Sequence, residues 1–143
     1  ITSDGLEQGY FVEPTIFINT TPDMQIVREE IFGPVLVIQK FKDEAEAIKL
    51  ANDTPYGLAA GVFSQDDAKA LRVIKKIRAG ITSINAYNLA YAEAPWGGYK
   101  QSGLGRGLGT FGLDEFSEVK QININLDVSP TNWFERSRAV ESK

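Results

Sequence analysis

Short apolar runs alternate with helix-forming segments along this chain, and that alternation constrains the fold more than any other feature. The runs are "PVLVIQKF" at 34–41, "GLAAGVFS" at 57–64 and "ITSIN" at 81–85. Continuous apolar runs of this length, bounded by turn residues, are typical of strands that are covered on both faces. Because these strands alternate with helices, the sequence predicts an α/β fold with right-handed crossovers and a largely parallel sheet.

The two segments between these runs carry the signals of helices. Asp43 followed by Glu46 is similar to a capping box and predicts a helix that ends near "NDTPYG" at 52–57. The segment "QDDAKALRVIKKIRAG" at 65–80 has acids in its first turn, bases in its last turn and apolar residues at helical spacing. It predicts a second helix with Gly80 as its C-cap.

Weaker patterns flank this central alternation. "YFVEPTIFINT" at 10–20 predicts an extended segment at a sheet edge or a break, because Pro14 cannot donate to a ladder. "MQIVREEIF" at 24–32 predicts a short helix that the following Gly-Pro pair ends. "TFGLDEF" at 110–116 predicts another short helix.

The segment "QININL" at 121–126 has the period of a strand with one exposed face. Ile122, Ile124 and Leu126 alternate with polar residues. A strand with one apolar face invites a partner, so we expect this segment to pair outside its own chain. The tail from 129 to 143 is expected to be a partly ordered extension.

The composition narrows the chemistry that is available. The chain has 143 residues, which fits one domain, and contains neither cysteine nor histidine. Thiolate and histidine ligands are therefore absent, and we expect no metal site. The net charge of −4 opposes a nucleic-acid partner, and no segment approaches the roughly 18 apolar residues of a membrane span. Because the first residue is Ile1 rather than methionine, we expect this to be part of a longer chain.

The glycine-rich run "GGYKQSGLGRGLG" at 97–109 first suggests a phosphate site, because closely spaced glycines let backbone N–H groups approach an anion. Its glycines do not have the G-x-G-x-x-G spacing, and it lacks the Gly-Lys-Ser/Thr of a P-loop. We therefore favour a tight loop packed close to backbone or ligand.

Trp96 lies between a proline and two glycines in the loop that leaves the third apolar run. Loops at the carboxyl ends of parallel strands commonly build sites in α/β sheets. An indole face there could hold a quaternary ammonium group by cation–π attraction. The alternative is a tryptophan that seals the edge of the core.

Glu29 and Glu30 lie near the carboxyl end of the helix predicted over 24–32, where carboxylates oppose the helix macrodipole. One interpretation is a solvated helix end. In the other, a carboxylate accepts two ribose hydroxyls while the neighbouring Phe32 packs against a planar base.

Six motifs occur in a characteristic order and spacing along the chain: "EEIFGPV", "NDTPYGLAAGVFS", "INAYN", "PWGGYKQSG", "LGRGLG" and "EVK". Together they resemble the C-terminal part of the NAD(P)-dependent aldehyde dehydrogenase superfamily, over nearly the whole chain from about Gly9 to Leu126. The segment "EAPWGGYKQSG" around Trp96 is most similar to the betaine aldehyde branch of that family.

The resemblance implies roles for particular residues. It assigns Glu30 to the nicotinamide ribose of NAD or NADP and Phe32 to a position near the nicotinamide, while Glu29 keeps the solvated interpretation. It makes Trp96 one wall of an aromatic box around a trimethylammonium group. It also implies that Asn85 and Gly80 shape the strand end beneath the substrate channel.

The resemblance further implies a homo-oligomer. The family's final strand pairs with a neighbouring subunit, which assigns Ile122 and Ile124 to an interface near which Arg106 and Glu118 should meet. The expected organisation is then a distal part of a catalytic domain over 1–120, an oligomerisation strand over 121–128 and an extension over 129–143. Gly107 stands where the family often has glutamate, so a proton-relay role for that acid is not assigned.

The family's reaction needs a cysteine thiolate to attack the aldehyde, a thiohemiacetal that yields hydride to NAD, and a water that hydrolyses the thioester. The resemblance places the nucleophile and the general base upstream, so we expect the isolated 143 residues to be inactive and to bind NAD weakly. We expect the full-length aldehyde dehydrogenase to be cytoplasmic. The alternatives are a non-catalytic module that binds quaternary ammonium compounds through Trp96 and a structural assembly piece.

Overall fold

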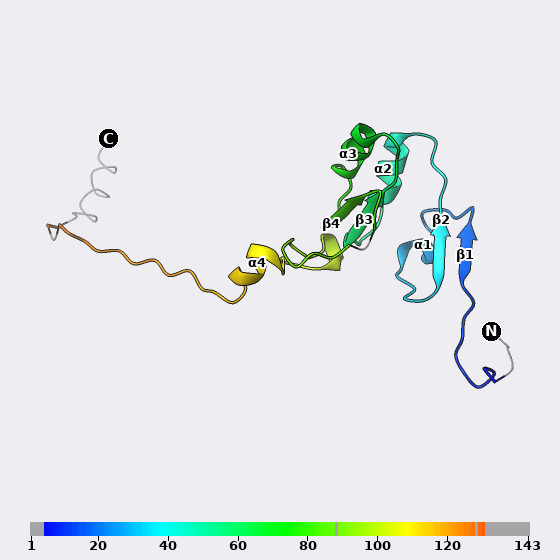
Figure 1. Cartoon of the computed structure of the whole chain (residues 1–143), viewed down its shortest axis with the longest axis horizontal. Coiled ribbons are helices and arrows are strands. Elements are labelled where there is room, and N and C mark those ends of the chain that lie inside the picture. The colour runs from blue at the N-terminus through cyan, green and yellow to red at the C-terminus, as the bar shows by residue number, and fades with distance from the viewer. Residues whose placement is uncertain (1–4, 88, 128, 131–143) are drawn as a thin grey trace, which may run out of the picture.

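The computed structural model describes residues 5–87, 89–127 and 129–130. Among these residues, four short strands form two parallel pairs (Figure 1). β1 (Thr15–Ile18) pairs with β2 (Val35–Ile38), and β3 (Ala59–Val62) pairs with β4 (Ile81–Ile84). The predicted parallel α/β architecture is confirmed. The single continuous sheet that the strand order implied is not present, because β2 and β3 do not pair.

The helices begin close to where the sequence predicts; α2 also ends at Asn52, as predicted, whereas α1 and α3 end earlier than predicted. α2 starts after Asp43, whose Oδ1 accepts from the Glu46 N–H at 2.9 Å, and α3 starts after Asp66, whose Oδ1 accepts from the Lys69 N–H at 2.9 Å. These capping bonds satisfy N–H groups that the first helical turn leaves unpaired. The helices are α1 (Gln25–Arg28), α2 (Glu44–Asn52), α3 (Asp67–Ile74) and α4 (Gly109–Asp114), with a 3-10 turn, η1 (Lys100–Ser102).

Two predicted helix ends are wrong. α1 ends at Arg28, and Glu29 is already extended with φ −107° and ψ 148°, so Glu29 and Glu30 lie beyond the helix rather than in its last turn. α3 ends at Ile74, and the bonds that follow it join residues three apart, as in a tightened last turn. Gly80 is therefore not a C-cap; its N–H donates to the Gly57 carbonyl at 3.0 Å as β4 begins.

α2 and α3 lie side by side over the β3–β4 pair in Figure 1, and an ion pair links them. Arg72 of α3 donates from Nε and Nη2 to the two carboxylate oxygens of Glu44 on α2, at 2.9 and 2.7 Å. This hydrogen bond is the main cause that holds the pKa of Glu44 below its usual value of 4.5. The pair therefore favours the charged form of Glu44 in the folded chain.

The core of the described part is small. Its buried apolar side chains are Ala70, Ile74 and Ala79. The chain exposes 12556 Å², whereas a compact protein of this mass exposes about 7,300 Å². Leu36 in β2 is 56% exposed, so the prediction that this strand is covered on both faces is wrong for the chain by itself. The fold thus leaves apolar faces open to contact with other polypeptide.

The predicted strand over 121–126 does not form within this chain. Beyond α4 the backbone runs away from the other elements (Figure 1), and Ile122 and Ile124 are 77% and 78% exposed. A strand is defined by the ladder it makes, and this segment has no ladder partner in the described residues. Most of the predicted extension, residues 131–143, lies outside the described residues. In the part of the chain that the structure describes, no helix has the length and apolar character needed to cross a membrane.

Candidate functional site

Two motifs that are far apart in the sequence form one hydrogen-bonded unit, which we call the loop cluster (residues 52–57 and 98–102). The Gly57 N–H donates to Ser102 Oγ at 2.9 Å, and the Gly57 carbonyl accepts from the Tyr99 N–H at 2.8 Å. A Cβ on Gly57 would come within 2.6 Å of the Arg78 carbonyl oxygen, so only glycine fits this approach. The cluster lies at the amino ends of β3 and β4, because Gly57 is two residues before β3 and its carbonyl also accepts from the N–H of Gly80, the residue before β4.

The glycine-rich run is a tight loop packed against backbone, as one of the two sequence interpretations had it. A Cβ on Gly80 would lie 1.8 Å from the Gly97 carbonyl oxygen. Trp96 and Gly107 exchange two backbone hydrogen bonds of 2.8 Å, which close the run into a loop. The loop therefore depends on the absence of side chains, and no phosphate needs to be invoked for its glycines.

The two acids that follow α1 share one cleft but differ in their hydrogen bonds. Glu29 and Glu30 both line an open cleft of about 470 Å³ together with Tyr56, Gln101 and Ser102. Glu29 Oε2 also accepts from Gln25 Nε2 at 2.9 Å, so Glu29 has a local partner. The structure thus brings Glu30 next to the loop cluster, which the sequence alone did not predict.

Phe32 has an unusual backbone conformation and a free-standing ring. Its φ is 55°, in the left-handed region that an aromatic residue rarely adopts, and its side chain is 93% exposed. The Phe32 ring does not line the cleft that Glu30 lines. An exposed ring held at a strained position is available for contact with a ligand or with other polypeptide.

Arg28 and Asp53 form a bidentate pair that sequence reasoning missed. Arg28 Nη1 lies 3.0 Å from Asp53 Oδ1, Nη2 lies 3.2 Å from Oδ2, and Nη1 also donates to the Asp53 carbonyl at 3.0 Å. Asp53 is the C-cap of α2 and belongs to the loop cluster. The sequence feature that could have pointed to this pair is the arginine of "REE", two residues before Glu30.

Lys100 reaches the same helix end from the other side and was also missed. Its Nζ donates to the Asn52 carbonyl at 2.9 Å and to the Thr54 carbonyl at 3.0 Å, in part-buried surroundings. Its φ of 53° is unusual for a residue other than glycine. The only sequence signal was its position between the glycines of "GGYKQSG".

Trp96 is half-buried beside a small pocket of about 250 Å³. The pocket is also lined by Tyr91, which is 58% exposed and which the sequence reasoning did not single out. Its floor is Gly80 to Thr82, the amino end of β4. The predicted location at the carboxyl ends of the strands is therefore wrong, because the loop after β4 runs back along the strand before it reaches Trp96.

Asn85 and Gly80 do not lie together, although the resemblance placed both beneath one strand end. Asn85 follows the carboxyl end of β4, with φ 52°. Its Oδ1 accepts from the Ser64 N–H at 2.8 Å and its Nδ2 donates to the Ser64 carbonyl at 2.9 Å. The Asn85 amide thus joins the carboxyl ends of β3 and β4, while Gly80 lies at the opposite end of β4.

Arg106 is held within the glycine-rich loop. Its guanidinium lies over the Tyr99 ring, 5.0 Å from the centroid, and Nη1 donates to the carbonyls of Gly98, at 3.0 Å, and of Gly105. No ion pair between Arg106 and Glu118 is present in the described residues, because Glu118 lies on the segment that runs away from the loop. Their meeting at a subunit interface stays a prediction.

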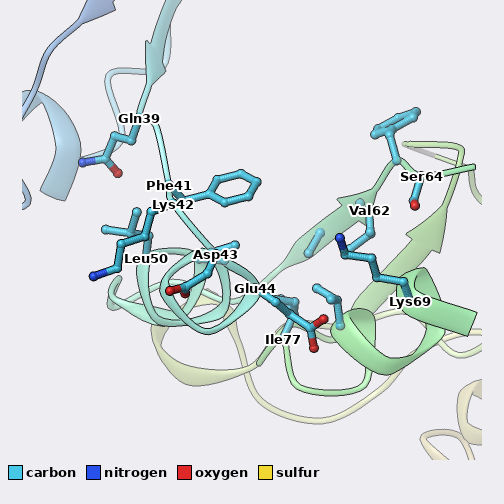
Figure 2. A pocket seen from close by; sticks show the side chains of 16 residues that line it. Gln39, Phe41, Lys42, Asp43, Glu44, Leu50, Val62, Ser64, Lys69 and Ile77 are labelled. Atoms are coloured by element: carbon cyan, nitrogen blue, oxygen red, sulfur yellow. The ribbon is translucent and has the colours of Figure 1, made fainter. Parts of the chain in front are cut away.

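A groove of about 610 Å³ lies between α2 and the β3–α3 unit. Figure 2 shows the Phe41 ring pointing from the β2–α2 connection into this space, with Val62 of β3 across from it. Leu50 and Ile77 add to its apolar lining, and Lys69 lies near its rim. None of the residues predicted to bind cofactor or substrate lines it.

Comparison with known proteins identifies the family. The profile of the aldehyde dehydrogenase family matches residues 1–122. The betaine aldehyde dehydrogenase of Bacillus subtilis (strain 168) is 53% identical over 129 residues, which are 90% of this chain and 26% of that protein. The peroxisomal aminoaldehyde dehydrogenase 2 of Pisum sativum is 48% identical over 130 residues, which are 91% of this chain and 26% of that protein.

Solved structures agree with the sequence relatives. A crystal structure of apo betaine aldehyde dehydrogenase from Staphylococcus aureus superposes with a TM-score of 0.86 at 50% identity, over 92% of this chain and 26% of that one. A second crystal structure of that enzyme, in complex with NAD+, superposes with a TM-score of 0.85 at 50% identity over the same shares. The chain spans about a quarter of the length of the relatives that it matches. It belongs to the aldehyde dehydrogenase family.

Proposed function

We propose that this chain is the C-terminal part of an aldehyde dehydrogenase that oxidises betaine aldehyde, or a related aminoaldehyde, to its carboxylic acid. The observation that carries the substrate class is the pocket that Trp96 and Tyr91 both line. Two aromatic faces can attract a quaternary ammonium group through their π electrons. Relatives named for betaine aldehyde and for aminoaldehydes, at 53% and 48% identity, support the same class.

The residues after α1 fit half of a dinucleotide site. Glu30 presents an exposed carboxylate at a cleft, where it would accept hydrogen bonds from the two ribose hydroxyls. Phe32 presents an exposed ring, which would pack beside the nicotinamide. The bound NAD or NADP would supply the hydride acceptor. A related enzyme was solved with NAD+, which supports NAD over NADP.

The nucleophile has to come from polypeptide outside these residues, because the chain contains no cysteine. We therefore expect the 143 residues alone to show no NAD-dependent aldehyde oxidation and weak binding of NAD. A measurable turnover by the purified chain, free of any full-length enzyme, would contradict this part of the proposal.

The substrate assignment is tested by replacing Trp96 in the full-length polypeptide that carries this chain. We expect Trp96→Ala to raise the KM for betaine aldehyde about tenfold, because cation–π attraction in a desolvated site contributes up to about 2 kcal/mol. The KM for an uncharged aliphatic aldehyde of similar length should change much less. An equal rise for both aldehydes would mean that Trp96 only shapes the loop.

A non-catalytic module is the second candidate, since the Trp96 pocket is present in the chain by itself. Titration of the isolated chain with betaine or choline, followed by tryptophan fluorescence, separates the two. The enzyme proposal expects little response because other walls of the box would be missing. Saturable binding at micromolar ligand would favour the module.

Assembly and location are also part of the proposal. We propose that the full-length protein forms a homo-oligomer through Ile122 and Ile124, with Arg106 and Glu118 meeting near that interface. The exposure of both isoleucines supports an outside partner. A structural assembly piece, which would only join subunits, remains the third candidate function.

Cytoplasmic location stays a prediction, because the related Pisum sativum enzyme is named peroxisomal.

A further inference from the structure

We propose that the carboxyl end of α2 sets the position of the cofactor-side segment (residues 29–32) relative to the Trp96 loop (residues 89–107), with Arg28 and Lys100 as positioning residues. This inference rests on the proposed function for its kinetic consequences. Its structural basis is independent of that function, because it is the convergence of two cations from distant segments on one helix end.

Three successive carbonyls at this helix end are satisfied by side chains from elsewhere. The Asp53 carbonyl accepts from Arg28, and the carbonyls of Asn52 and Thr54 accept from Lys100, all at 2.9 to 3.0 Å. The last carbonyls of a helix lack partners within the helix and carry its negative dipole end, so cations bind there favourably. Each cation therefore brings its own segment to a fixed place on α2.

The two cations lie close in sequence to the residues they would position. Arg28 is two residues before Glu30, and its bidentate pair with Asp53 fixes the direction as well as the distance of the approach. Lys100 is four residues after Trp96 and keeps a left-handed backbone at φ 53°. Such strain persists only where surrounding contacts enforce it, and the two carbonyl bonds of Lys100 act there together with the backbone bond of 3.0 Å from the Gln101 N–H to the Pro55 carbonyl.

α2 is itself held to the β3–α3–β4 unit at both ends. Asn52 donates from Nδ2 to the Lys76 carbonyl at 2.9 Å and accepts the Arg78 N–H at 2.7 Å. At its other end Glu44 is paired with Arg72. The helix is therefore a common reference for both segments, and the loss of one cation should release one segment without releasing the other.

The test is a set of methionine variants in the full-length polypeptide. Arg28→Met should weaken NAD binding about fivefold with the KM for betaine aldehyde unchanged within about twofold. Lys100→Met should raise that KM about tenfold with NAD affinity unchanged. Arg28→Lys should recover most of the NAD affinity. Calorimetric titration with NAD+ and steady-state kinetics give the two numbers.

Arg78→Met is the control for Arg28→Met, because it removes an exposed arginine whose side chain forms no ion pair within the described residues. Lys49→Met, which removes an exposed lysine of α2, is the control for Lys100→Met. Neither control should change the NAD affinity or the KM by more than about twofold. Equal effects of Arg28→Met and Arg78→Met, or no effect of Arg28→Met and Lys100→Met, would overturn the proposal.

Hydrogen exchange separates this inference from the proposed function. Arg28→Met should speed amide exchange over residues 29–33 but not over 96–102, and Lys100→Met should do the reverse, whether or not NAD binds. If the unaltered protein binds no NAD but the two variants show this exchange pattern, the proposed function fails and the positioning stands. If the unaltered protein binds NAD and neither variant changes the amide exchange, the positioning fails. Should Arg28→Met not fold, Asp53→Asn removes the same charge pair with a smaller change.

Discussion

Single glycines in this fold are fixed by the backbone that they approach. The Gly80 Cα lies so close to the Gly97 carbonyl that no side chain fits between them, and Gly57 makes a similar approach to the Arg78 carbonyl. Gly107 is different, because nothing lies within 4 Å of the Cβ it would carry. Glycines of one motif set therefore differ sharply in how much substitution they tolerate.

Gly80→Ala should destabilise the full-length protein by about 3 kcal/mol or more, because the added methyl forces two backbone segments apart. The measurement is the shift of the thermal unfolding midpoint. Gly107→Ala is the matched control and should stay within about 0.5 kcal/mol. Similar shifts for both variants would show that the close approach at Gly80 relaxes easily.

The Glu44 carboxylate predicts a pH dependence of known sign. Its pKa is lowered by the hydrogen bond from Arg72, so the folded state favours the charged form. The contribution of this ion pair to the stability of the fold is fully present above the usual pKa of 4.5, and it is lost as the pH falls through the lowered pKa of the folded state. Glu44→Gln should therefore lower the thermal midpoint at pH 6, and the difference should disappear as the pH falls below 4.5. A difference that persisted in acid would contradict this assignment.

At the scale of elements, the start and the end of α2 could be predicted, whereas the ends of α1 and α3 could not. Asp43 caps α2 as its capping-box pattern predicts, and α2 ends at Asn52, within the predicted stretch 52–57. Asp66 was expected only as one of the acids in the first turn, and the structure shows that its side chain caps α3. The ends of α1 and α3 depend on where tertiary contacts begin, and the Gly80 N–H is bound by the Gly57 carbonyl from a distant turn.

Asp66→Ala should cost about 1 kcal/mol, because it removes the acceptor for the Lys69 N–H at the start of α3. Asp67→Ala changes a neighbouring acid of the same helix without removing that bond, and should cost less than half as much. Chemical denaturation of the full-length protein measures both. The reverse ranking would mean that charge near the helix end matters more than the cap.

The site was predictable residue by residue but not as an arrangement. Glu30, Phe32 and Trp96 were singled out from motifs, and their binding roles stay predictions. The convergence of Arg28 and Lys100 on α2 depends on contacts between segments 25 and 48 residues apart. No local pattern records such pairings. The return of the Trp96 loop to the amino end of β4 was missed for the same reason.

The whole molecule exposes more surface than a self-sufficient domain of its size. Its accessible area exceeds that of a compact protein by about 5,000 Å², and large apolar side chains occupy much of the excess. The groove between α2 and β3, the outer residues of β2 and the segment after α4 all contribute. Elements that belong to one sheet in a complete domain would then stand apart in this chain, as the two strand pairs do.

Replacing Ile122 and Ile124 by lysine in the full-length protein should reduce the assembled mass, because two charges would face a partner strand. Light scattering after size exclusion measures the mass. The matched control replaces Gln121 and Asn123, on the opposite face of the predicted strand, by lysine. Loss of assembly in both pairs would show that alternation does not define the contact, and loss in neither would remove the interface role of this segment.

The amide of Asn85 carries a consequence of its own. It closes the carboxyl ends of β3 and β4 with one donor and one acceptor, each matched to the opposite group on Ser64. A carboxylate of nearly the same shape could accept but not donate, and would leave the Ser64 carbonyl facing a negative charge. Shape is thus not what this position specifies. It specifies one donor beside one acceptor, so replacing the amide nitrogen by an oxygen, as in Asn85→Asp, would break the match with Ser64 while leaving the shape almost unchanged.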